Sequence, residues 1–337
     1  MSGPLDAYPL LLQPRLHRRL WGGSRLAAWL GDTGLPVSGP ADEPVGEAWL
    51  VGADNLVTNG AYRGVSLGAL AATHGAALVG EAPFARYGAV VPLLAKLLDA
   101  REDLSIQVHP DDAYARREHP GSGHLGKAEA WYVLEAAPGA GVLRGFTRAT
   151  EPAALRAAAL DGTLPSLMRR LPVVPGSVVV NPAGTVHAVG AGCLLFEIQQ
   201  ASDLTYRLFD YGRRGADGAP RELHLDRALA VADLSGGGEQ GAAPRPSSSG
   251  WTRLVQLPEF SLDARAMAGG APLAGATSAA SFELLFVAAG EATVAGGGVA
   301  ASLVAGGAAV LPAGLGAYTL QGEGTILRCL AGAGRSA

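Results

Sequence analysis

LSIQVHPDD, at residues 104–112, places an amide and an imidazole two residues apart within an apolar, strand-forming stretch. These side chains are Gln107 and His109. Residues two apart on an extended strand point to the same face of a sheet. We therefore expect Gln107 and His109 to project together into one cavity of a β-structure.

Two further stretches supply matching polar groups. GKAEAWY, at residues 126–132, holds Lys127 and Glu129 with the same two-residue spacing, and PAGTVHA, at residues 182–188, adds His187. Two imidazoles, a carboxylate and an amide oxygen form a mixed set of nitrogen and oxygen donors that suits a divalent metal with an open position. The sequence thus predicts a working metal site rather than a structural one.

The segments around these motifs are typical of an antiparallel β-sandwich or barrel. Short β-rich runs, punctuated by Gly and Pro, occur at residues 131–135, 178–181 and 194–198. Helices are expected at residues 67–78, at residues 111–117 and at residues 152–170 with a break near Gly162. The last of these lies between two motif strands, and we expect it to cap the cavity.

Three regions are expected along the chain. Residues 1–234 carry the motifs and form a catalytic domain with helical insertions. Residues 235–250 are rich in Gly, Ser and Pro and are expected to be a flexible linker. Residues 251–337 are expected to form a smaller all-β domain.

The C-terminal region contains a degraded repeat of the motif region. PGSVVVNPAGTVHA at residues 175–188 is similar to AGGAAVLPAGLGAY at residues 305–318. Aligning the two PAG triplets places Ala317 opposite His187. The repeat keeps the turn and lacks the imidazole, so one metal-binding unit and one without metal are expected.

Composition excludes several classes of partner. The 337 residues carry a net charge of −4, which provides no global basic field for nucleic acid or an anionic membrane. No apolar run reaches membrane-spanning length, and no signal peptide is recognisable. Cys193 and Cys329 lack the spacing of metal ligands. We expect a cytoplasmic chain with reduced thiols, present as a monomer or a small homo-oligomer.

The motifs together resemble type I mannose-6-phosphate isomerases, in particular the short bacterial form. The resemblance covers residues 10–232 and includes, besides the stretches above, WGG (21–23), GEAW (46–49), PLLAK (92–96), EIQQASDLTYRLFDY (197–211) and RELHL (221–225). It implies a mainly β fold of two cupin-like, jelly-roll barrels with a few helical insertions. It also implies a metal-dependent interconversion of mannose 6-phosphate and fructose 6-phosphate.

The resemblance implies a ligand set for one metal ion per chain. Position by position, the ligands are Gln107, His109, Glu129 and His187. Zinc is the favoured ion, although a glutamine oxygen leaves Mn²⁺ or Fe²⁺ possible on geometry alone.

The resemblance also implies the groups that handle the sugar phosphate. Arg207 would stabilise the negative charge of a cis-enediol intermediate beside the metal. Lys127 would transfer a proton or hold a hydroxyl, but Lys127, Glu197 and a metal-bound water all remain candidates for the general base. Ser105 and Lys96 would bind the phosphate.

Alternatives remain at each level. Arg207 could instead form a salt bridge with Asp203 or Asp210, and Lys96 could be a solvated lysine. The chain could also be a cupin enzyme for another sugar, an iron-dependent oxygenase or a sugar-binding module without turnover. An oxygenase would more usually show two histidines and one carboxylate without the glutamine.

Overall fold

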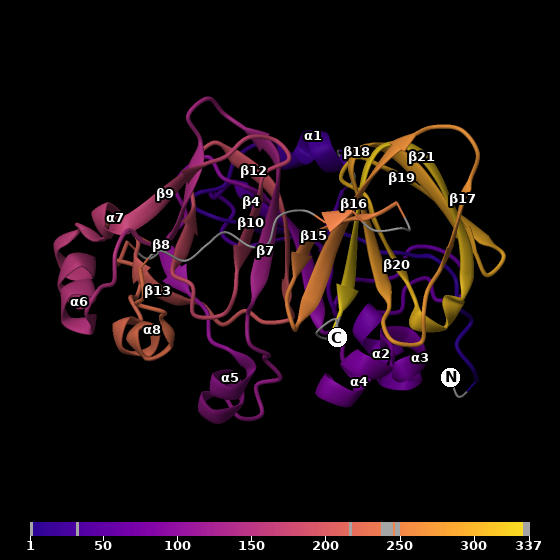
Figure 1. Cartoon of the computed structure of the whole chain (residues 1–337), viewed down its shortest axis with the longest axis horizontal. Coiled ribbons are helices and arrows are strands. Elements are labelled where there is room, and N and C mark those ends of the chain that lie inside the picture. Colours follow the sequence, from indigo (N-terminus) through magenta and orange to yellow (C-terminus); the bar gives the residue numbers. More distant parts are fainter. Residues whose placement is uncertain (1–2, 32–33, 216–217, 237–244, 247–249, 333–337) are drawn as a thin grey trace.

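The computed structural model describes residues 3–31, 34–215, 218–236, 245–246 and 250–332. Strands dominate these residues and form three sheets, arranged as two β-units side by side (Figure 1). Most of the expected linker at residues 235–250 lies outside the described residues. Within it, β14 (Arg245–Pro246) pairs with β15 (Thr252–Gln256) of the second unit.

The first unit is a sandwich of two sheets, and its neighbouring strands are antiparallel except for β2 and β3. The seven-stranded sheet has the order β10 (Val178–Asn181), β7 (Glu129–Ala136), β12 (Cys193–Gln200), β5 (Leu93–Asp99), β4 (Val45–Val51), β2 (Arg15–Arg18) and β3 (Val37–Ser38). The five-stranded sheet has the order β13 (Tyr206–Phe209), β6 (Ile106–Val108), β11 (His187–Val189), β8 (Gly141–Phe146) and β9 (Met168–Pro172).

The second unit is built on one nine-stranded sheet. Its main path runs β1 (Leu10–Leu11), β20 (Ala308–Leu311), β18 (Glu283–Gly296), β21 (Ala317–Ala331), β16 (Phe260–Ala268), β15 and β14. β17 (Leu273–Ala276) pairs with β21, and β19 (Val299–Val304) pairs with β18. Because β1 comes from the start of the chain, the N-terminal residues contribute a strand to this sheet.

The two units share a hydrophobic core. Along β12, Glu197 lines a cavity of the first unit, whereas its neighbour Phe196 points the other way. Phe196 stacks on Phe286 of β18 with ring centroids 4.3 Å apart, and both side chains are fully buried. Alternation along one strand therefore supplies polar groups to the cavity and apolar groups to the contact between units.

Replacing Phe286 by alanine is expected to lower the free energy of unfolding by about 3–5 kcal/mol, because the substitution leaves a cavity in this shared core. Urea denaturation followed by circular dichroism measures the loss. Leu160→Ala is the matched control, since Leu160 is 68% exposed. A loss for Phe286→Ala no larger than that of the control would show that the stacked rings do not stabilise the fold.

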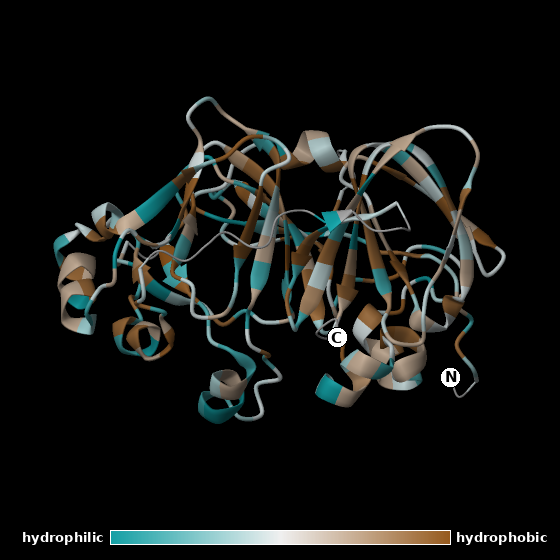
Figure 2. Cartoon of the chain, viewed as in Figure 1, coloured by the Kyte–Doolittle hydropathy of each residue, from teal (hydrophilic) through white to brown (hydrophobic). Residues whose placement is uncertain are grey.

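Three short helices from the first half of the chain, α2 (Leu67–His74), α3 (Ala76–Val79) and α4 (Glu81–Tyr87), lie beside the second unit (Figure 1). The backbone amide of Glu81 donates to the carbonyl of Ala279 at 2.7 Å. Helix α5 (Asp112–Glu118) begins at the side-chain cap of Asp111 and is coloured largely hydrophilic in Figure 2. Helices α1 (Leu26–Leu30) and α8 (Leu225–Val231) are likewise short, and none of the described helices is long and apolar enough to cross a membrane.

The expectation that residues 152–170 cap the cavity is wrong. They form α6 (Pro152–Asp161), α7 (Leu164–Leu167) and the start of β9. The first helix ends at Gly162, where a break was expected. Leu155 of α6 packs with Ile106 and Val108 of β6. These β6 residues point away from Gln107, so α6 covers the outer face of the five-stranded sheet.

Candidate active site

The candidate site is a cavity of about 460 Å³ in the first unit. Gln107 on β6 lies directly opposite His187 on β11 and opposite Arg207 on β13. Directly opposed residues of antiparallel strands point to the same face. Gln107, His187 and Arg207 therefore form one row on the five-stranded sheet, while Glu129 comes from β7 of the other sheet.

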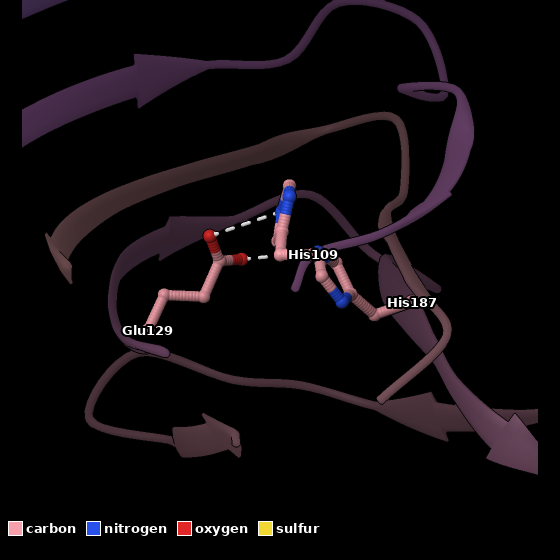
Figure 3. Close-up of side chains that lie close together, drawn as sticks. All are labelled: His109, Glu129 and His187. Atoms are coloured by element: carbon pink, nitrogen blue, oxygen red, sulfur yellow. Dashed lines mark ion pairs between the residues drawn. The ribbon is translucent and has the colours of Figure 1, made fainter. Parts of the chain in front are cut away.

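His109, Glu129 and His187 form a compact buried cluster (Figure 3). Nε2 of His109 is 3.4 Å from Oε2 of Glu129, and Nε2 of His187 is 3.1 Å from Oε1 of Glu129. The three side chains are at most 1% exposed, and their potential ligand atoms lie within 4.8 Å of one another. The structure thus brings together three of the four expected ligands.

Backbone contacts orient both imidazoles. Nδ1 of His109 contacts the carbonyl of Leu204 at 2.9 Å, and Nδ1 of His187 contacts the carbonyl of Thr185 at 2.8 Å. A carbonyl oxygen only accepts, so each Nδ1 carries the proton and each Nε2 keeps its lone pair. Such contacts fix the ring orientation and the tautomer that a metal requires.

The donor set fits a divalent cation. Oε1 of Glu129 and Nε2 of His187 are buried and form no hydrogen bond with any described residue, which is costly unless another group binds them. Burial alone would raise the pKa of Glu129, but Lys127 and the two histidines hold it well below its usual range. Burial and Lys127 lower the pKa of His109 to about 3. Both residues are therefore in the protonation state that binds a metal.

Lys127 lies directly against this cluster. Its Nζ is 3.0 Å from Nε2 of His109 and forms an ion pair with Glu129, and the side chain is 4% exposed. β7 begins at Glu129, so Lys127 precedes the strand rather than lying on it as the sequence suggested. Its ammonium still reaches the cavity beside the potential metal ligands.

Ser105 and Lys96 both line the same cavity. The hydroxyl of Ser105 donates to Oε1 of Gln107 at 3.3 Å, which places it next to the metal cluster. Lys96 is 5% exposed, and its Nζ lies 3.3 Å from Oε2 of Glu197. Lys96 is therefore a buried, paired cation and not a solvated lysine.

Arg207 points into the cavity and is incompletely paired. One terminal nitrogen donates to the carbonyl of Glu222 at 2.9 Å, and its buried Nε has no partner among the described residues. In that part of the chain it forms no ion pair with Asp203 or Asp210, because Asp210 binds Arg213 and Arg221 instead. The guanidinium is therefore available to a bound molecule.

The sequence analysis missed several charged residues of the cavity wall. The cavity is lined by six cationic side chains and four carboxylates, namely Arg18, Arg19, Lys96, Lys127, Arg207 and Arg221 with Glu43, Glu47, Glu197 and Asp203. These ten side chains carry an excess of two positive charges in a chain of net charge −4, and such a local excess favours an anionic ligand. The GEAW motif at residues 46–49 contained the signal for Glu47.

The second unit repeats the strand register of the first. Glu129 pairs with Asn181, and Glu283 pairs with Leu311, where residues 181 and 311 correspond in the aligned repeat. The same correspondence places Ala317 at the position of His187. The register therefore reproduces the alignment read from the sequence.

Two antiparallel β-units, one of which holds a buried His–Glu–His cluster, define a cupin-type protein with a candidate metal centre. Residues 10–131 match the model of the phosphomannose isomerase type I catalytic domain, and residues 252–330 match that of the mannose-6-phosphate isomerase cupin domain. Mannose-6-phosphate isomerase ManA of Bacillus subtilis is 35% identical over 93% of this chain and 96% of its own length. Mannose-6-phosphate isomerase of Streptococcus mutans is 38% identical over 74% of each chain.

A solved structure agrees with these matches. The crystal structure of the Bacillus subtilis mannose 6-phosphate isomerase superimposes with a TM-score of 0.82 at 32% identity, over 95% of this chain and 99% of that one. The chain belongs to the type I mannose-6-phosphate isomerase family and is an enzyme of the aldose–ketose isomerase class. The expected family and the mainly β, cupin-like fold are both confirmed.

Proposed function

We propose that the chain interconverts mannose 6-phosphate and fructose 6-phosphate with one bound zinc ion. His109, Glu129 and His187 would hold the ion, and Gln107 would be the fourth ligand. The buried His–Glu–His cluster, in which Oε1 of Glu129 and Nε2 of His187 form no hydrogen bond with any described residue, is the observation that carries this proposal. Zinc accepts this mixture of imidazole and oxygen ligands.

The proposed reaction moves a proton between C1 and C2 of the sugar through a cis-enediol. The metal, when bound, polarises the sugar oxygens on these carbons. Arg207 adds a fixed positive charge from the same row of side chains as Gln107 and stabilises the enediolate. Lys127 is close enough to the ligands to hold a sugar hydroxyl or to transfer the proton.

Glu197 remains the other protein candidate for the general base. Burial and the nearby Glu129 raise its pKa, although Lys96 opposes this shift. Oε1 of Glu197 accepts from the indole of Trp131 at 3.0 Å. Its carboxylate is therefore held by two partners, whereas Lys127 adjoins the metal ligands themselves.

The phosphate group is proposed to bind Lys96 and Ser105. Burial would lower the pKa of Lys96, but Glu197 and Glu47 raise it, so the ammonium stays charged inside the protein. Ser105 and Gln107 are hydrogen-bonded, which supports a phosphate subsite beside the proposed metal site. The excess of cationic side chains around the cavity favours a dianionic substrate.

The domain division is part of the same proposal. Residues 1–234 would form the catalytic unit and residues 251–337 a cupin unit without the ligand set. The pairing of β1 with β20 adds one N-terminal strand to the second sheet.

Chelation is expected to abolish isomerisation of mannose 6-phosphate, and zinc is expected to restore it. The chelated protein loses the cation that would polarise the sugar oxygens, while the described fold retains its own core. Coupled assays on as-purified, chelated and zinc-restored protein measure this, with Mn²⁺ and Fe²⁺ as comparison metals. Absence of turnover in fully loaded protein would refute the proposed reaction, and full activity after complete chelation would refute the role of the metal.

A further inference from the structure

Two sequence motifs that the proposed mechanism does not use meet in the structure. Gly22 of WGG and Gly46 of GEAW touch, because a Cβ on Gly22 would lie 2.7 Å from Cα of Gly46. A Cβ on Gly46 would lie 2.8 Å from Cβ of Arg19 and 3.0 Å from Cα of Gly22. Only glycine at both positions permits this close approach of the two segments. The approach places Arg19 next to Glu47 of β4.

Glu47 is the centre of this contact. It is 8% exposed, and its two oxygens accept from Nε and Nη2 of Arg19 at 3.0 Å each. Its Oε2 also accepts from the indole of Trp49 at 2.8 Å. Burial would raise the pKa of Glu47, but Lys96 and Arg19 outweigh this and lower it to about 2. Glu47 is therefore a fixed negative charge.

Trp49 connects Glu47 to the cavity lysine. It lies directly opposite Lys96 across β4 and β5, and Nζ of Lys96 is 5.1 Å from the centre of its ring. The ring also contacts the imidazole of His17, with centroids 4.2 Å apart. The indole orientation, set by its bond to Glu47, thus determines the surface against which the Lys96 ammonium rests.

We propose that Glu47 is a positioning residue that sets the affinity for the phosphate end of the substrate. It holds Trp49 by a hydrogen bond. Glu47 on β4 and Glu197 on β12 lie on the two strands that flank β5, so the two carboxylates balance the charge of Lys96 from opposite sides. Among the described residues, Glu47 forms its hydrogen bonds with Arg19 and Trp49 and none with the metal cluster. This inference rests on the proposed function, in which Lys96 binds phosphate.

Glu47→Gln is expected to raise KM for mannose 6-phosphate about tenfold and to change kcat less than threefold, because a misplaced Lys96 weakens substrate and transition state equally. Trp49→Phe keeps a ring beside Lys96 and leaves the Arg19–Glu47 pair intact, but it removes the bond to Glu47. Trp49→Phe should therefore also raise KM for mannose 6-phosphate. Glu47→Asp, which keeps the charge, should restore part of the affinity.

A binding measurement separates this inference from the reaction itself. Glucitol 6-phosphate carries the phosphate but no carbonyl group, so its dissociation constant, measured by calorimetry, does not depend on turnover. Glu47→Gln should weaken its binding about tenfold relative to the wild type. If the wild type binds it but turns over no mannose 6-phosphate, the proposed reaction fails while the role of Glu47 is still tested.

Asp263→Asn is the matched control. Asp263 is 1% exposed and pairs with Arg253 and Arg328 in the second unit. Its substitution should lower thermal stability and leave KM unchanged. The proposal is overturned if Glu47→Gln behaves like this control, if it lowers kcat at unchanged KM, or if wild-type protein does not bind glucitol 6-phosphate.

Discussion

Replacing Glu129 by alanine is expected to abolish metal binding and to lower turnover about 1,000-fold or more. The substitution removes the carboxylate that lies between His109 and His187. It also leaves the buried ammonium of Lys127 against the imidazole of His109 without the Glu129 carboxylate, which further disfavours a cation there. Loss of a metal worth several kcal/mol of charge stabilisation corresponds to this change in rate.

Metal content by elemental analysis and turnover of mannose 6-phosphate test this prediction together. Glu135→Ala is the control on the same strand, since Glu135 is half exposed and pairs with Arg25 and Trp29 instead. It should retain metal and activity. A Glu129→Ala protein that keeps stoichiometric zinc, in a fold verified by circular dichroism, would remove Glu129 from the ligand set.

Arg207→Ala is expected to keep the metal and to lose about 100- to 1,000-fold in kcat. The guanidinium lies in the row of Gln107 and His187, and its Nε has no partner among the described residues. A donor aimed at charge that develops during the reaction contributes mainly in the transition state, so KM should change little. Steady-state kinetics combined with zinc analysis measures both effects.

The control for Arg207 is Arg214→Ala. Arg214 is exposed and donates to the carbonyl of Gly218, outside the residues that line the cavity. It should leave kcat and KM unchanged. If Arg207→Ala kept wild-type kcat, the arginine would have no part in stabilising the enediolate, and if it lost zinc, its role would be structural.

Local motifs made the metal cluster predictable. The two-residue spacing in residues 104–112 and 126–132 placed His109 and Glu129 toward one cavity, and PAGTVH positioned His187 at the start of its strand. The roles of Lys127, Ser105, Lys96 and Arg207 came from the family resemblance and stay predictions, although all four side chains line the same cavity. Where functional side chains lie within short motifs, the sequence alone can identify the candidate residues of a site.

Contacts between distant strands were not predictable in the same way. The Arg19–Glu47 pair depends on two glycines 24 residues apart that touch only after β4 has formed. Helix α6 shows the other limit. Its sequence predicted a helix with a break near Gly162, but it did not reveal which face of a two-sided sheet the helix covers.

The repeated register has a consequence for protein engineering. Lys96 pairs with Glu197 in the first unit, and the corresponding strand positions of the second unit hold Asp263 and Arg328, so the signs of the buried charges are exchanged. The chain therefore contains two versions of one scaffold in which this buried ion pair has opposite orientations. Grafting residues between them, position by position, would separate what the backbone contributes to catalysis from what the side chains contribute.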